Sequence, residues 1–123
     1  MADNPQELFG LRLGHVGINA SDNDEAVAIA ERFTDLLGLP GRETPISIFP
    51  NELVEVMREG GRGEKGHIGL HVDADKMADA EAWFAERGFP VEESSRRLMP
   101  DGTTRLVYFQ EPIGGFAIHL TQE

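Results

Sequence analysis

The chain contains an internal repeat, and this repeat constrains the fold more than any other feature of the sequence. Residues 14–40 read "GHVGINASDNDEAVAIAERFTDLLGLP" and residues 66–90 read "GHIGLHVDADKMADAEAWFAERGFP". Both segments open with Gly-His-aliphatic-Gly, 52 positions apart, and continue through strand-like residues to an acidic cap and a helical pattern. Both end on glycine, a hydrophobic residue and proline. We therefore interpret the chain as two copies of one structural unit.

Each copy continues into further strands, whose alternation and turn residues predict their bounds. Strands are predicted at 12–20, 46–49 and 53–58 in the first copy, and at 67–72, 90–98, 104–110 and 116–121 in the second. A unit of this size cannot bury one sheet face alone, so the two copies must pack together. We expect one domain over residues 1–123, with module one at about 12–58, a glycine-rich linker at about 59–66 and module two at about 67–122. The predicted fold class is α+β, with two tandem βαβββ-type modules that form a curled mixed sheet around a cleft.

Each copy also predicts one amphipathic helix. In the first helix, at about 22–37, Ser21 or Asp22 is the expected cap and Gly38 the expected stop. Its predicted buried stripe consists of Ala26, Ile29, Ala30, Phe33, Leu36 and Leu37. In the second helix, at about 73–88, the expected buried residues are Met77, Ala80, Trp83 and Phe84.

Alternation along the strands decides which side chains face the predicted cleft. By this count His15, Glu55, His67 and His119 all face it. The repeat relates His15 to His67, and it relates Glu55 to His119. Two related pairs on one surface predict a site for a divalent metal ion, held by nitrogen and oxygen because the chain has no cysteine. Zinc, nickel, iron, cobalt and manganese all suit such ligands.

Other side chains are expected to line a substrate pocket around these four. They are His71, Asn19, Ser47, Phe49, Tyr108 and Arg105. His71 is displaced from His67 by two residues, about 6–7 Å along a strand, so both cannot bind one ion without a bend in the chain. We expect His71 to face the substrate or to support a ligand from behind.

Four segments carry a resemblance to a known family: "LGHVGINASD", "ELVEVM", "KGHIGLHVD" and "EPIGGFAIHLTQ". In this order they make residues 12–122 resemble the vicinal oxygen chelate superfamily, which includes glyoxalase I, methylmalonyl-CoA epimerase, extradiol dioxygenases and bleomycin resistance proteins. The resemblance implies paired modules around one metal-binding cleft, with ligands from the first and last strand of each module. Those positions are His15, Glu55, His67 and His119. The last position is more often glutamate in the lyase and epimerase branches, so His119 departs from the pattern and Glu55 becomes the candidate catalytic base.

These observations predict a metal-dependent lyase or isomerase that acts on a small α-hydroxycarbonyl or 2-keto acid metabolite. One alternative is a non-catalytic protein that binds a small ligand, like the resistance proteins of the superfamily. Another is an iron-dependent dioxygenase, in which two histidines and Glu55 form a facial triad.

The composition excludes other classes of function. The formal net charge is −11, which opposes binding to nucleic-acid phosphates and to anionic membrane surfaces. No segment approaches the roughly 20 apolar residues of a membrane-spanning helix. We expect a cytoplasmic protein with a small-molecule substrate and no nucleic-acid or membrane partner. Edge strands at both ends of the sheet, together with the resemblance, predict a homodimer.

Overall fold

The computed structural model describes residues 4–38 and 41–123. Its strands are β1 (Arg12–Asn19), β2 (Arg42–Glu43), β3 (Ser47–Asn51), β4 (Val54–Met57), β5 (Gly66–Val72), β6 (Arg97–Leu98), β7 (Thr104–Tyr108) and β8 (Phe116–Gln122). Its helices are α1 (Pro5–Phe9), α2 (Asn23–Leu37) and α3 (Met77–Glu86), with short 3-10 turns η1 (Ala74–Lys76) and η2 (Glu93–Ser95). The α+β class is confirmed. None of the described helices has the length and apolar character needed to cross a membrane.

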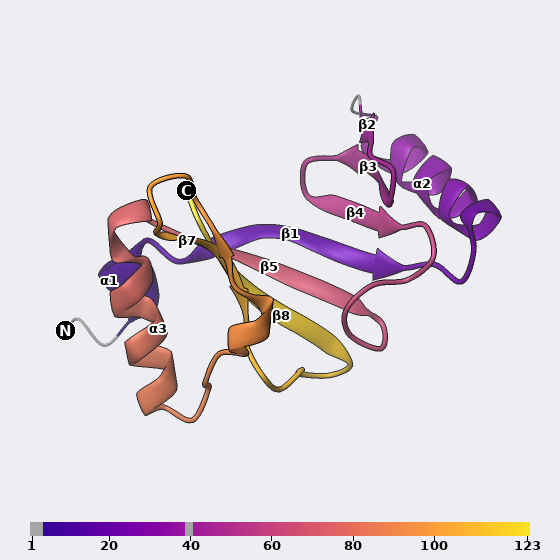
Figure 1. Cartoon of the computed structure of the whole chain (residues 1–123). Coiled ribbons are helices and arrows are strands. Elements are labelled where there is room, and N and C mark those ends of the chain that lie inside the picture. Colours follow the sequence, from indigo (N-terminus) through magenta and orange to yellow (C-terminus); the bar gives the residue numbers. More distant parts are fainter. Residues whose placement is uncertain (1–3, 39–40) are drawn as a thin grey trace.

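All the described strands belong to one curled, mixed sheet in the order β2-β3-β4-β1-β5-β8-β7-β6. In each half the first strand pairs in parallel with the last strand, β1 with β4 and β5 with β8. The halves are joined by antiparallel pairing of β1 with β5. In that pairing His15 lies opposite Gly69, and Gly17 lies opposite His67. The repeated motifs are therefore related by an approximate two-fold axis at the centre of the sheet (Figure 1).

The start of α2 follows the predicted capping pattern. Asp22 is the N-cap, and its side chain accepts a hydrogen bond from the Glu25 backbone N–H at 2.8 Å. The Glu25 carboxylate in turn accepts from the Ser21 backbone N–H at 2.9 Å. The helix ends at Gly38, whose φ of 64° lies in the left-handed region that glycine adopts easily.

Two hydrophobic clusters hold the helices to the sheet. One centres on Ala20, Ala26, Ala30 and Val56 beneath α2, and the other on Phe9, Val72, Met77, Ala80, Val107 and Leu120 beneath α1 and α3. Figure 1 shows α2 at one end of the molecule and α1 with α3 at the other. The larger second cluster includes the predicted residues Trp83 and Phe84 at its margin.

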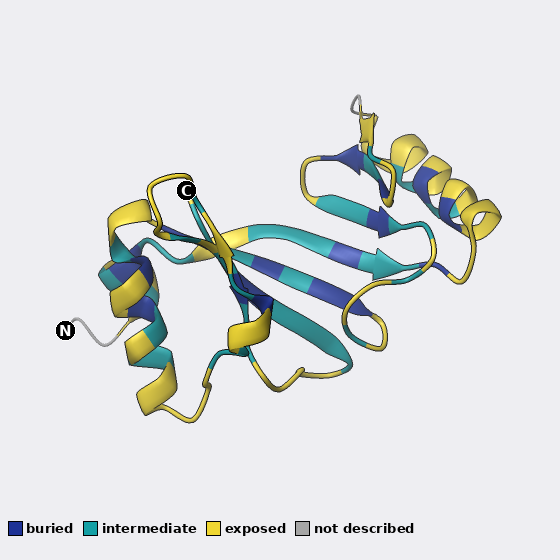
Figure 2. Ribbon diagram, viewed as in Figure 1, coloured by how far each residue is buried: buried dark blue, intermediate teal, exposed yellow. Residues whose placement is uncertain are grey.

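The predicted stripe of buried residues on α2 is wrong at the C-terminal end of the helix, where Leu36 is 75% exposed and Leu37 is 40% exposed. A helix of 15 residues is about 22 Å long, whereas strands of four and five residues span at most about 17 Å. The last turn of α2 therefore extends past the strands that it covers. Figure 2 shows the outer surface of this helix as exposed.

The residues before β1 form α1, which is not among the predicted elements; Asn4 is its N-cap, Pro5 lies in its first turn, and the helix buries Phe9. Two other expectations about local structure are wrong. Most of the predicted strand at 90–98 is a loop containing η2, so that only Arg97–Leu98 pairs as β6. The predicted helix at 73–88 begins with η1, and α3 itself runs only over Met77–Glu86.

Candidate metal centre

Three imidazoles converge on one face of the sheet, which we call the histidine face. His15 comes from β1, His67 from β5 and His119 from β8, and one potential ligand atom from each lies within 4.8 Å of the others. The Nε2 atoms of His15 and His67 are 2.9 Å apart. His67 and His119 are buried, while the His15 side chain is 19% exposed. Alternation along the strands predicts these side chains on one face, and here they lie together.

Glu55 on β4 completes the group from the side of the first repeat. Its Oε1 lies 3.1 Å from Nε2 of His67 and 3.5 Å from Nε2 of His15. Burial raises the pKa of the Glu55 carboxyl, but hydrogen bonds with His15 and His67, and a further one with Ser47, outweigh burial. The pKa of Glu55 is therefore held well below its usual range, and the carboxylate is ionised.

His119 is held in a form that suits metal binding. Its Nδ1 lies 2.9 Å from Oγ1 of Thr121 on the same strand. When Nδ1 carries the proton and donates to Thr121, the lone pair of Nε2 is left for a metal. Burial, followed by the charges of His15 and His67, lowers the pKa of His119 to about 3, so the ring is neutral.

The second glycine of each repeated motif makes room for these rings. A Cβ atom at Gly69 would lie 2.7 Å from Cε1 of His15 and from Cε1 of His119. A Cβ atom at Gly17 would overlap the ring of His67. The repeated Gly-His-aliphatic-Gly motif thus puts one histidine on β1 and one on β5. The second glycine of each motif leaves room for the histidine of the other strand.

Three of the predicted pocket residues lie next to this group. Ser47 is fully buried, forms a hydrogen bond with Thr44 at 2.8 Å and contacts Glu55. The Phe49 ring lies 6.2 Å from the ring of His15, and the Tyr108 ring lies 5.0 Å from the ring of His119. Burial raises the pKa of the Tyr108 hydroxyl.

The other three predicted pocket residues are engaged elsewhere. His71 pairs through Nδ1 with Glu123 at 2.5 Å. The Asn19 amide donates to the Gly63 carbonyl at 2.9 Å, so it holds the segment 59–65. Arg105 is exposed, and because side chains alternate along β7 it lies on the opposite face from Tyr108. The structure therefore does not bring Arg105 to the histidine face.

Arg62 is a neighbour of the site that the sequence did not point to. Its guanidinium carbon lies 4.5 Å above the centre of the Tyr108 ring, and its Nη1 donates to Glu92 at 2.8 Å. The glycine-rich segment 59–66 predicted only a linker, since no periodicity relates Arg62 to β7. Only the folding of this segment against the second repeat brings the two side chains together.

The donor set fits a divalent metal ion. Three imidazole nitrogens within 4.8 Å and an ionised carboxylate beside two of them are the ligands that such ions take when thiolates are absent. The two glycines leave the space that the rings need. All four sequence-predicted ligands, His15, Glu55, His67 and His119, thus lie in one group.

No protein-family model and no curated protein matches the sequence. Among solved structures, the chain is similar to a methylmalonyl-CoA epimerase in complex with methylmalonyl-CoA and NH4+, with a TM-score of 0.58 and 19% identity over 91% of this chain and 94% of that one. It is also similar to methylmalonyl-CoA epimerase from Mycobacterium tuberculosis, with a TM-score of 0.54 and 17% identity over 89% and 86% of the two chains. For 2,2',3-trihydroxybiphenyl 1,2-dioxygenase from Sphingomonas wittichii strain RW1 the TM-score is 0.62 and the identity 14%, over 91% of this chain and 40% of that one. At such identities the likeness is one of fold.

Proposed function

Because the chain has the vicinal oxygen chelate fold, which the epimerases and the dioxygenase share, we propose that it is a metal-dependent isomerase or lyase. The observation that carries this proposal is the convergence of three imidazoles within 4.8 Å, with Glu55 beside two of them. The proposed substrate is a small α-hydroxycarbonyl or 2-keto acid, whose adjacent oxygens suit a chelating ion.

In this proposal His15, His67, His119 and Glu55 hold the ion. A bound divalent ion supplies Lewis-acid chemistry, which stabilises the negative charge that develops on a substrate oxygen when a neighbouring C–H bond is broken. Thr121 fixes the ring of His119, and Ser47 fixes the carboxylate of Glu55.

The chain's own side chains supply the proton transfer and the walls of the site. Glu55 is ionised, which is the form that a proton acceptor requires. Tyr108 stays protonated because burial raises its pKa, so its hydroxyl can donate a hydrogen bond to a substrate oxygen. Phe49 and Tyr108 flank the histidines from the two halves of the sheet and give the site aromatic walls.

Hydrogen-deuterium exchange tests the proposal. Hydroxyacetone and 2-oxobutyrate are incubated in D₂O with metal-loaded protein, and the loss of C–H signal beside the carbonyl is followed by NMR. With the metal-loaded wild-type protein we expect exchange faster than in buffer alone. With Glu55→Gln and with metal-free protein we expect the rate of exchange in buffer alone. Glu86→Gln, an exposed change of equal charge on α3, is the control and should exchange like the wild type. If the metal-loaded protein binds both compounds but does not speed their exchange, the result supports the alternative of a non-catalytic protein that binds a small ligand.

A second candidate, an iron-dependent dioxygenase, is favoured by the likeness to the trihydroxybiphenyl dioxygenase. The chain spans 40% of the length of that enzyme. Oxygen consumption by the iron-loaded protein in the presence of a catechol tests this candidate. No consumption, together with carbonyl-linked exchange, excludes it.

We also propose a homodimer. Ile46 and Leu53, beside β3 and β4, are 65% and 57% exposed, and contact with a second copy would remove this apolar surface from water. Light scattering with and without a chelator gives the oligomeric state, and a monomer in both conditions contradicts the proposal.

A further inference from the structure

Arg62 is held at the rim of the histidine face by two contacts. Its guanidinium lies on the Tyr108 ring, whose centre is 5.0 Å from the centre of the His119 ring. Its Nη1 donates a hydrogen bond to the Glu92 carboxylate at 2.8 Å. A cation therefore lies one aromatic ring away from His119.

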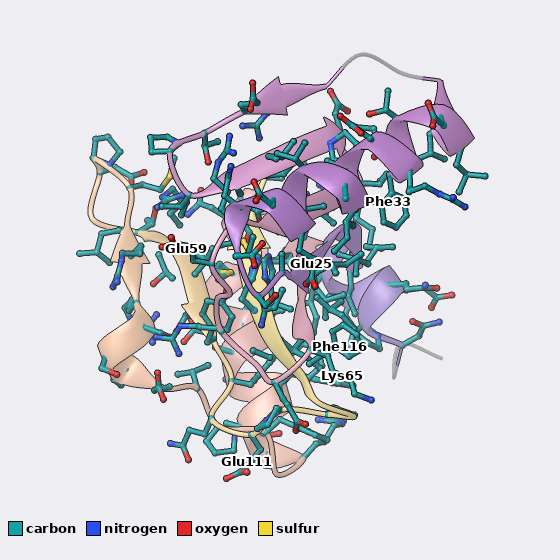
Figure 3. The ribbon with its side chains drawn as sticks, turned by 90° about the vertical axis from the view of Figure 1, so that its right-hand side faces the viewer. Glu25, Phe33, Glu59, Lys65, Glu111 and Phe116 are labelled. Atoms are coloured by element: carbon teal, nitrogen blue, oxygen red, sulfur yellow. The ribbon has the colours of Figure 1, made fainter. Side chains whose placement is uncertain are left out.

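The segment that carries Arg62 is itself fastened just after this residue. The Asn19 amide donates to the Gly63 carbonyl at 2.9 Å. The Lys65 backbone N–H donates to the Gly115 carbonyl at 2.8 Å, just before β8. Figure 3 shows Lys65 and Phe116 close together where this segment meets the start of β8. Little conformational freedom remains to be lost when Arg62 binds a ligand.

One edge of the Arg62 guanidinium has no acceptor among the residues that the structure describes. Nη1 donates to Glu92, but Nε and Nη2 make no hydrogen bond within 4–38 and 41–123. These two N–H groups form the edge that binds a carboxylate with two parallel hydrogen bonds. Arg96 is the contrast, since its Nε, Nη1 and Nη2 all donate to Glu81, Glu93 or Thr104.

Stacking on an aromatic ring does not by itself indicate a site. Arg87 lies 3.5 Å from the centre of the Trp83 ring on α3, where it covers the outer surface of a helix. Arg62 differs because the ring beneath it contacts a proposed metal ligand and because its carboxylate-binding edge is open.

We propose that Arg62 binds a second carboxylate of the substrate, so that the chain prefers 2-oxo dicarboxylic acids to 2-oxo monoacids. This inference rests on the proposed function, since the first carboxylate and the 2-oxo group would bind at the histidines. Glu92 already neutralises part of the Arg62 charge, which favours a singly charged carboxylate over a doubly charged phosphate.

A matched pair of ligands tests the inference. The acids 2-oxoglutarate and 2-oxovalerate have the same carbon chain and the same chelating group, and differ only in a carboxylate or a methyl group at the far end. Their dissociation constants for zinc-loaded protein are measured by calorimetry. We expect wild-type protein to prefer 2-oxoglutarate by about tenfold or more, as a charge-assisted bidentate pair implies. In Arg62→Gln the preference should fall to about twofold, with the affinity for 2-oxovalerate unchanged.

Arg87→Gln is the control, because it also removes a stacked arginine and one positive charge but lies away from the histidine face. It should keep the wild-type preference. If the wild type binds both acids equally, or if Arg62→Gln weakens both to the same extent, the inference about Arg62 is overturned while the metal-chelating function stands. If zinc-loaded protein binds neither acid, the proposed function fails together with the inference.

Discussion

The imidazole of His67 occupies the space in which a side chain at Gly17 would begin. Gly69 bears the same relation to His15 across the approximate two-fold axis. We predict that Gly17→Ala and Gly69→Ala each lower zinc affinity by at least about tenfold, because the added methyl group displaces a ligand ring. Competition with a chromophoric chelator measures the affinity.

Gly14→Ala is the matched control for these substitutions. A Cβ atom at Gly14 would meet the ring of His71, which is not in the proposed ligand set. We expect this variant to retain zinc affinity within about threefold of the wild type. Equal losses in all three variants would indicate that alanine disturbs the central strands generally, and not the ligand rings.

Removal of individual histidines separates the metal ligands from their neighbours. His15→Ala and His67→Ala should abolish stoichiometric metal binding, since each removes an imidazole of the converging group. His71→Ala should leave the stoichiometry intact, because its ring pairs with Glu123. Calorimetric titration of the three variants measures the stoichiometry. Loss of the metal in His71→Ala with retention in His67→Ala would show that the ligand set is wrong.

Thr121 should act on the metal through His119. Thr121→Val removes the hydroxyl that lies 2.9 Å from Nδ1 of His119 and keeps the shape of the side chain. We predict a fall in zinc affinity of about 10-fold to 100-fold, as found when a ligand histidine loses its supporting hydrogen bond. Thr121→Ser restores a hydroxyl and should recover most of the affinity. Unchanged affinity in Thr121→Val would mean that packing alone orients the ring.

The stability of the metal-free protein should fall in mild acid. The pKa of His119 is about 3 in the folded protein against an ordinary value of 6.5, so between these values the unfolded chain binds more protons. The contribution of the neutral His119 ring to the free energy of unfolding is therefore complete above pH 6.5. It is lost as the pH falls, by about 1 kcal/mol per pH unit. Urea unfolding at pH 5 and pH 7 measures the difference. His119→Gln should reduce the difference in the free energy of unfolding between pH 5 and pH 7. If the difference is unchanged in this variant, the loss of stability does not come from His119.

Much of the fold and of the candidate site could be predicted from local sequence patterns. The repeat located two units, and alternation placed His15, Glu55, His67 and His119 on one face because the side-chain period of a strand is two. Asp22 and Gly38 bounded α2 because capping depends on residues close together in the chain. These features depend on neighbours within a few positions.

Side-chain alternation does not hold along the whole of β1, because its ladder with β5 is irregular. Arg12 lies opposite His71 and His15 lies opposite Gly69, so a register shift separates them around Gly14. The shift adds one residue to β1 and places Arg12 within 2.7 Å of Glu123, the partner of His71. An alternating count through β1 puts Arg12 on the other face.

Contacts between distant segments were decided only by the tertiary structure. Gly17 and Gly69 have their role because β1 pairs with β5 in one register, which brings a ring from one repeat over a glycine of the other. Arg62 reaches Tyr108 because the segment after β4 folds against the second repeat. Leu36 and Leu37 are exposed because the strands beneath α2 are shorter than the helix. A local pattern specifies the direction in which a side chain points, whereas its partner depends on the packing of the whole sheet.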